Sequence, residues 1–228
     1  MLTRKIQRNV KTVELALSAS MAAIYIVSTL FPVSPFIGGP GFITLEIVML
    51  PVIAALLRPA LAGVSITVGS IGMALLRTSI YGFFGPLGLL VPIVATVLGS
   101  VGFHYRFGLF VPWAYVLAGA VFYLAFSQGT VLWLIPYLAV IVSPIVVLRL
   151  SGLLKMGFLS LYTAMSEQVG LNVLSISVLG LVGAVWTGIT PFMFSERTLA
   201  TVGGAILIVA LKSRLGSRLE NSLDLERR

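Results

Sequence analysis

The chain has 228 residues, of which 58% are hydrophobic and 10% charged, and its formal net charge is +8. Soluble domains carry about 25% charged residues, so this chain lacks the polar material to cover a water-facing surface. Its mean hydropathy of +1.09 indicates that lipid solvates much of it. The charges lie at both ends and singly between apolar runs. This placement is typical of membrane proteins and argues against nucleic-acid binding.

Side chains that carry chemistry are scarce. The chain has no cysteine and one histidine, His104, so disulfides, thiolate ligands and clustered His or Cys metal sites are excluded. His104 stands at an expected helix end, where an interfacial histidine is a better interpretation than a Ser-His-Asp triad. The sequence has no Walker A, HExxH or GxSxG pattern. We therefore predict no enzymatic activity, catalytic residue, metal or cofactor.

The chain begins with a basic segment, residues 1–12, followed by an apolar run that starts at Val13. A secretory signal peptide has the same order of charge and apolar residues. However, no convincing small-x-small cleavage site follows a short apolar core here. We expect residues 13–31 to be retained as a first membrane-spanning helix.

Residues 32–42 combine prolines, glycines and aromatic side chains. Such a stretch cannot be a lipid-exposed helix, because its backbone groups would lack hydrogen-bond partners. It is either an exterior loop or backbone that lines a cavity inside the protein.

Charged residues and Gly-Pro clusters divide the remaining sequence into apolar segments long enough to form spans. Further spans are predicted at residues 44–57, 60–76, 87–103, two within 107–148 divided near 127–129, then 169–189 and 198–211, with an interfacial helix at 150–168. The prediction is an all-α, polytopic transmembrane bundle of about six to eight spans at 13–212, followed by a charged tail at 213–228.

The positive-inside rule orients this bundle in the cell membrane. With the N-terminus in the cytosol, the interior loops contain Arg58, the His104–Arg106 region and the Arg149–Lys155 region, besides both basic ends. The exterior loops contain only Arg77 and Arg197. This asymmetry predicts that both termini are cytoplasmic.

Small residues are frequent in the predicted helices. In the first helix they are Ala16, Ala19, Ser20 and Ala23, and Ala19 and Ala23 form a small-xxx-small pair that permits close helix approach. Gly69 and Gly72, and Gly180 and Gly183, are expected to act similarly in their helices. Packing within the chain is the alternative to a surface for a partner.

Glu46 is the most informative polar residue, since a carboxylate at the membrane is costly and indicates function. It stands at the start of a short span, directly after the glycine-proline stretch. Two interpretations remain open. Glu46 stabilises a helix N-terminus, where negative charge is favourable, or it faces a ligand that enters from outside.

Other residues at the predicted exterior level could contact the same ligand. The charged ones are Arg77 and the pair Glu196 and Arg197, for which snorkelling to lipid headgroups is the alternative. The aromatic ones are Phe36, Phe42, Tyr81, Phe84 and Trp186, and for Trp186, as for Trp133, interfacial anchoring is the alternative. Glu167 and Asn172 are expected near the interior end of their span, outside an exterior pocket.

Three segments together resemble the substrate-binding S components of energy-coupling factor (ECF) vitamin transporters. They are ELALSASMAAIY at residues 14–25, LPVIAALLRPALAGV at residues 50–64, and SERTLATVGG at residues 195–204. They correspond to a small-residue first helix, a short second helix with a tight turn and a glycine-bearing third, and a last helix.

The resemblance implies a function and a set of partners. The chain would bind a vitamin-like micronutrient from outside, and Ala16, Ala19, Ser20 and Ala23 would dock on a transmembrane coupling protein that works with ATPase subunits. The absence of an ATP-binding motif agrees with that division of labour. The alternatives are a self-sufficient secondary transporter, which would require an inverted repeat, and a membrane assembly or scaffold protein.

Overall fold

The computed structural model describes residues 2–35, 41–76 and 84–223, and the side chains among residues 12–214 of these ranges. The described chain is all-α apart from one short hairpin. Its elements are α1 (Leu2–Ser28), β1 (Pro32–Pro35), β2 (Phe42–Thr44), α2 (Glu46–Leu56), α3 (Pro59–Leu76), α5 (Pro86–His104), α6 (Phe110–Phe126), the 3-10 helix η1 (Val131–Leu134), α7 (Ile135–Val142), α8 (Pro144–Arg149), α9 (Gly152–Ser177) and α10 (Val185–Leu223).

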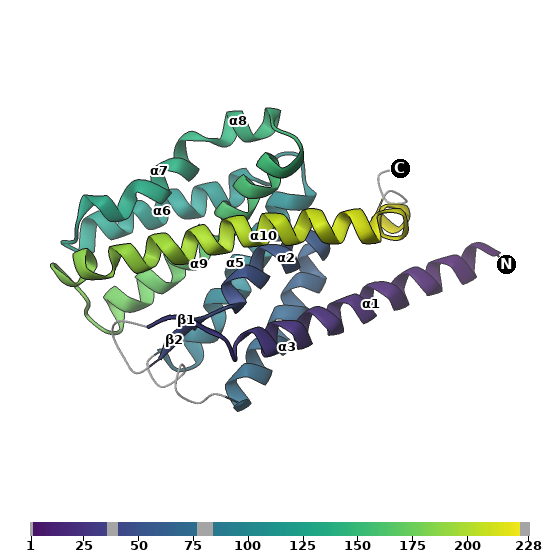
Figure 1. Cartoon of the computed structure of the whole chain (residues 1–228), viewed down its shortest axis with the longest axis horizontal. Helices are drawn as coiled ribbons and strands as arrows, with labels where there is room; N and C mark the ends of the chain where they lie inside the picture. The colour runs from purple at the N-terminus through teal and green to yellow at the C-terminus, as the bar shows by residue number, and fades with distance from the viewer. Residues whose placement is uncertain (1, 36–40, 77–83, 224–228) are drawn as a thin grey trace.

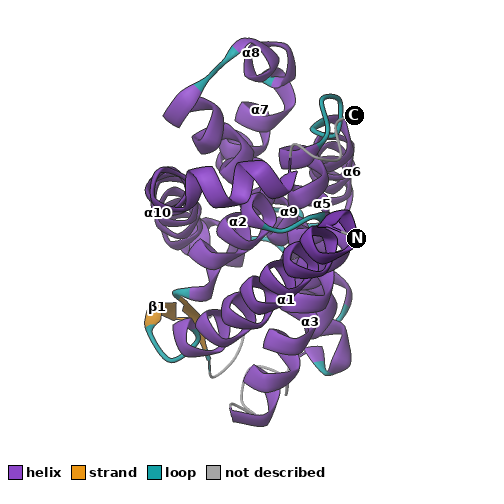
Figure 2. Cartoon of the chain, turned by 90° about the vertical axis from the view of Figure 1, so that its right-hand side faces the viewer, coloured by secondary structure: helices purple, strands orange, loops and turns teal. Residues whose placement is uncertain are grey.

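The helices form a bundle around α2 and α9. Every residue of α2 is buried, and α9 packs against α2, α5, α6 and α10. The start of α1 and the end of α10 lie at the same end of the bundle (Figure 1). Seen from that end, α2 and α9 lie in the interior, and α7 and α8 form an outer layer beside α6 (Figure 2).

Helix length and composition support a membrane protein. Three helical segments, Pro59–Leu76, Pro86–His104 and Val185–Arg214, are long and apolar enough to cross a membrane. Large apolar side chains cover much of the outer surface; Leu75, Val131 and Val142 are each more than 70% exposed. A soluble monomer rarely exposes so much apolar surface, whereas lipid-facing helices do.

Small residues permit the close helix crossings. A Cβ on Gly69 of α3 would lie 2.8 Å from the Tyr25 ring of α1, and a Cβ on Gly170 of α9 would lie 2.9 Å from Val91 of α5. Gly99 of α5 faces Thr163 of α9 with no room for a Cβ. The predicted packing role is confirmed for Gly69, and Gly72 next to Ile26 behaves in the same way.

The helix boundaries predicted for residues 150–189 are wrong. Instead of an interfacial helix and a separate span, one helix, α9, runs from Gly152 to Ser177. It is followed by a turn in which Gly180 and Gly183 have φ of 63° and 70°. Backbone in this left-handed region suits glycine and is incompatible with a helix interior. These two glycines therefore end a helix and start a turn, and do not pack helices together.

Two further predicted boundaries change. The first helix ends at Ser28, before residue 31, and the second predicted span within 107–148 is divided into η1, α7 and α8. Pro191, which was expected to separate two spans, lies inside α10. Since α10 begins at Val185, Arg197 lies within a helix and not in an exterior loop.

The glycine-proline stretch forms an antiparallel hairpin in its described part. Ser34 pairs with Ile43, and Pro35 pairs with Phe42. The backbone N–H of Leu45 donates to the Phe31 carbonyl at 2.9 Å and closes the base of the hairpin. The hairpin lies against α10, at the end of the bundle opposite the start of α1 (Figure 1).

Candidate functional site

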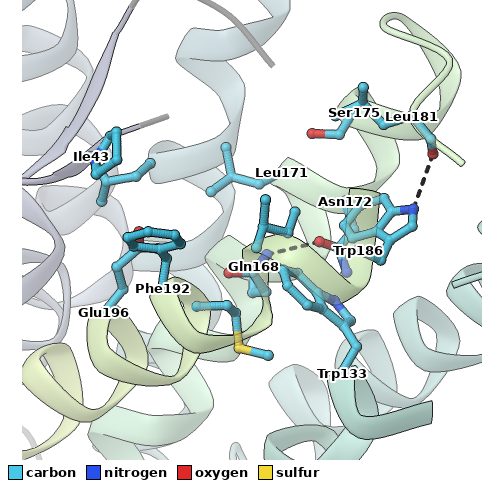
Figure 3. Close-up of a pocket in the computed structure, with 13 residues that line it drawn as sticks. Ile43, Trp133, Gln168, Leu171, Asn172, Ser175, Leu181, Trp186, Phe192 and Glu196 are labelled. Carbon is cyan, nitrogen blue, oxygen red and sulfur yellow. Dashed lines mark hydrogen bonds between the residues drawn. The ribbon is translucent and has the colours of Figure 1, made fainter. Parts of the chain in front are cut away.

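Two adjoining cavities lie beneath the hairpin. The first cavity, of about 50 Å³, lies between η1, α9, α10 and the hairpin (Figure 3). The second cavity, of about 70 Å³, lies between the hairpin, α1, α2, α3, α5 and α9. Ile43 of the hairpin and Leu171 of α9 line both cavities. The hairpin backbone thus lines a protein cavity, which was one of the two roles predicted for residues 32–42.

A buried ionic cluster connects the elements around the cavities. Arg197 of α10 is 2% exposed, and its Nη1 donates to Glu167 Oε2 at 2.6 Å and to the Ala164 carbonyl at 2.7 Å. Its Nη2 lies 3.6 Å from Glu196 Oε2. The hydroxyl of Ser34 donates to Glu196 Oε1. The cluster therefore ties α9, α10 and β1 together at the floor of the site.

Burial makes this cluster energetically important. Ions removed from water lose several kcal/mol of solvation, so each requires a partner inside the protein. Glu167 and Glu196 are 7% and 6% exposed. Arg197 was expected in an exterior loop, either in contact with a ligand or snorkelling to headgroups. The structure places it inside the bundle, because α10 starts a full three turns before it.

Amide groups of α9 form a second polar network. The side-chain amides of Gln168 and Asn172 approach within 2.8 Å of each other, and the Tyr137 hydroxyl lies 2.7 Å from the Asn172 amide. With the Asn172 oxygen turned toward Tyr137, the indole N–H of Trp133 also donates to it at 2.9 Å. Asn172 thereby connects α9 with η1 and α7.

Aromatic rings form one wall of the first cavity. The Trp133 and Trp186 rings are 4.9 Å apart between centroids, and Tyr123 packs against both at 6.1 and 5.2 Å. The Trp186 indole N–H donates to the Leu181 carbonyl at 3.1 Å. Both indoles are at most 2% exposed. Interfacial anchoring is therefore wrong for these two tryptophans.

Glu46 combines the two interpretations that the sequence left open. It is the first residue of α2, where its charge is favourable near the helix N-terminus. It is also 9% exposed and lines the second cavity together with Glu167. A helix-stabilising role and a position facing a ligand are thus compatible in this fold.

The structure brings all five of the described candidate binding residues to the two cavities. Trp186 and Glu196 line the first cavity, and Phe42, Glu46 and Phe84 line the second. Phe36, Arg77 and Tyr81 lie outside the described residues.

Glu167 and Asn172 were expected to lie away from the other candidate binding residues, and this expectation is wrong. Each of them lines a cavity, because α9 continues toward that end of the bundle up to Ser177. Gln168 and Ser175 were missed. The sequence spacing could have indicated them: Gln168, Asn172 and Ser175 stand at i, i+4 and i+7, which puts three polar side chains on one helix face.

The predicted docking residues share one outer face of α1. Ala16, Ala19, Ser20 and Ala23, the small-residue face, are all exposed. The neighbouring positions Met21, Ala22 and Tyr25 are buried, and α1 packs on α3. Packing within the chain therefore does not account for the small-residue face.

Neither a protein-family model nor a curated protein nor a solved structure matches this chain.

Proposed function

We propose that the chain is a multi-pass protein of the cell membrane that captures a small, vitamin-like micronutrient from outside, as an ECF-type S component does. The observation that carries this proposal is the pair of adjoining cavities at one end of an apolar bundle, lined by buried carboxylate, amide and aromatic side chains. Ligand sites in helical bundles combine apolar walls with a few convergent polar groups in this way. At about 50 and 70 Å³ the cavities are smaller than a vitamin, so the proposal requires that they widen when the ligand enters. Polar residues inside a membrane bundle are costly and mark functional sites.

The positions of the basic residues indicate which end of the bundle faces the cytosol. Arg58 follows α2, Arg106 follows α5, and Arg149 ends α8, and the order of the helices brings these turns to the end of the bundle that holds the start of α1 (Figure 1). The positive-inside rule puts that end in the cytosol. Both termini are then cytoplasmic, and the two cavities open toward the exterior.

The small-residue face of α1 supports a partner in the membrane. Helix–helix association in lipid depends on close backbone approach, which alanine and serine permit. Ala19 and Ala23 are one turn apart on this exposed face. A transmembrane coupling protein that carries ATPase subunits is the partner we propose, because the chain has no ATP-binding motif of its own.

A self-sufficient secondary transporter is the second candidate. The buried Glu167–Arg197–Glu196 cluster favours it, since intramembrane ionisable groups often couple ion movement to transport. Reconstitution of the purified chain alone into vesicles separates the two candidates. Uptake driven by an ion gradient without ATPases would support the secondary transporter.

Purification from the native membrane in mild detergent tests the proposal. Mass spectrometry should recover a small organic molecule with the chain, and pull-down should recover an ATPase-linked membrane partner. Recovery of neither would remove the proposed function.

A further inference from the structure

The buried ionic cluster beside the first cavity has one more negative than positive charge when both of its carboxylates are ionised. Arg197 is the only buried cation among the described residues, and two carboxylates share it. It is 2.6 Å from Glu167 but 3.6 Å from Glu196. Glu196 is therefore the less compensated carboxylate. Of these three residues, Glu196 alone lines the first cavity, so the residual negative charge of the cluster faces that cavity.

Aromatic side chains line the same cavity. Phe192 lies beside Glu196 on α10, and Trp133 and Trp186 lie farther along the cavity (Figure 3). The two indole N–H groups are used within the protein, by Asn172 and by the Leu181 carbonyl. The indoles are at most 2% exposed, so a ligand contacts only the part of each ring that lines the cavity. Such π surface attracts cations.

Two further polar side chains of α9 line the cavity, Gln168 and Ser175. The Gln168 side-chain amide lies 2.8 Å from that of Asn172. Gln168 is 5% and Ser175 6% exposed. Both side chains can exchange hydrogen bonds with a polar ligand in the cavity.

We infer that the first cavity binds a small organic cation, with a quaternary or protonated nitrogen beside Glu196 and Phe192 and the rest of the molecule toward Gln168 and the tryptophan rings. This inference rests on the proposed function and names the chemical class of its substrate. A metal ion fits poorly, because the described residues contain no group of three or more His, Cys, Asp or Glu side chains. One carboxylate in a cavity lined by aromatic side chains suits a weakly hydrated organic cation.

Tryptophan fluorescence of the full chain in detergent micelles tests the inference, since Trp133 and Trp186 lie at the cavity. The probes are choline, its neutral analogue 3,3-dimethylbutan-1-ol and the anion 3,3-dimethylbutanoate, which share one shape at the branched end. Choline should change the fluorescence saturably and bind at least tenfold more tightly than the alcohol. Glu196→Gln should reduce the affinity for choline to that for the alcohol. Glu14→Gln, a matched change on α1 away from both cavities, should leave it unchanged.

The variant Ser175→Ala tests whether a loss of affinity for choline is caused by misfolding. It removes one hydroxyl, and we expect a several-fold weaker affinity for choline with an unchanged thermal midpoint. If the alcohol or the anion binds as tightly as choline, or if Glu196→Gln retains the preference for choline, the inference is overturned while the proposed function stands.

If none of the three probes binds, the molecule that co-purifies with the chain decides the question. A positively charged molecule supports the inference, and a neutral or anionic molecule overturns it. If no molecule co-purifies, the inference is overturned, and the proposed function fails with it if no ATPase-linked partner is recovered either.

Discussion

Arg197 Nη1 lies 2.6 Å from Glu167 Oε2, and this contact joins α10 to α9 between the two cavities. Both side chains are buried, so neither charge can be satisfied by water if the other is removed. The pair therefore determines both the stability of the bundle and the shape of the site.

Removal of one partner of this pair should destabilise the protein strongly. Arg197→Ala leaves Glu167 buried and unpaired, and we expect a loss of about 3–5 kcal/mol in the free energy of unfolding. Unfolding in mixed micelles, followed by circular dichroism, measures it. The control is Arg149→Ala, which changes an exposed arginine at the end of α8. Equal losses in the two variants would contradict the role of the ion pair.

Replacement of glycine by alanine should lower the stability of the protein where two helices are in close contact, but not where the helix surface is open. A Cβ on Gly99 would collide with Thr163, so Gly99→Ala should cost about 1–3 kcal/mol, as overpacking does. Gly157→Ala in α9 meets no atom within 4 Å and should be neutral or stabilising by up to about 1 kcal/mol, since alanine favours helix. The same unfolding assay compares them, and a stable Gly99→Ala variant would show that the α5–α9 contact is looser than described.

Single cysteines can report the orientation, because the chain has none of its own. Gln128→Cys places a thiol in the turn between α6 and η1, near the cavities, and Tyr105→Cys places one after α5; both positions are exposed. In intact cells a membrane-impermeant maleimide should label Gln128→Cys but not Tyr105→Cys. After permeabilisation it should label both. The reversed pattern would put the cavities on the cytosolic side.

A bulky side chain on the small-residue face should prevent partner association and leave ligand binding intact. Ala19 is exposed, so Ala19→Trp should retain the fold and the bound small molecule but lose the ATPase-linked partner in pull-down and lose cellular uptake. The matched change on the buried face of α1 is Ala22→Trp, which should destabilise the fold itself. Retained partner association in Ala19→Trp would show that the partner docks elsewhere.

Local sequence patterns predict much of the fold. Arg58-Pro59 ends one helix and starts the next, and Pro86 starts α5 one residue before the predicted start of that span. These boundaries depend on neighbouring residues alone, because proline restricts its own backbone and that of the preceding residue. The all-α class follows directly from the apolar segments between them.

Local sequence patterns could not predict the boundary between α9 and α10. Gly180 and Gly183 stand in an apolar run, where glycine is equally typical of close helix packing. Their positive φ values depend on the turn that brings α10 back along α9, and this turn is a tertiary feature. The error moved Glu167 and Asn172 to the wrong end of the bundle.

Only part of the candidate site could be predicted from the sequence. Glu46 and Glu196 stand out because carboxylates are rare in this chain. The pairing of Glu167 with Arg197, thirty positions apart, and the contact of Asn172 with Tyr137, thirty-five positions apart, require the three-dimensional packing of separate helices. No local pattern encodes such contacts.

The proposed function requires that the cavities beneath the hairpin hold a small molecule, and two phenylalanine variants of α9 test this requirement. Ser175→Phe fills the first cavity from α9 with a bulky ring, whereas Ser177→Phe places the same ring on an exposed position of that helix. Mass spectrometry of small molecules purified with each variant and with the unmodified chain gives the answer. The proposal predicts one organic molecule with the unmodified chain and Ser177→Phe, and none with Ser175→Phe. The same molecule at equal occupancy in all three samples would contradict it.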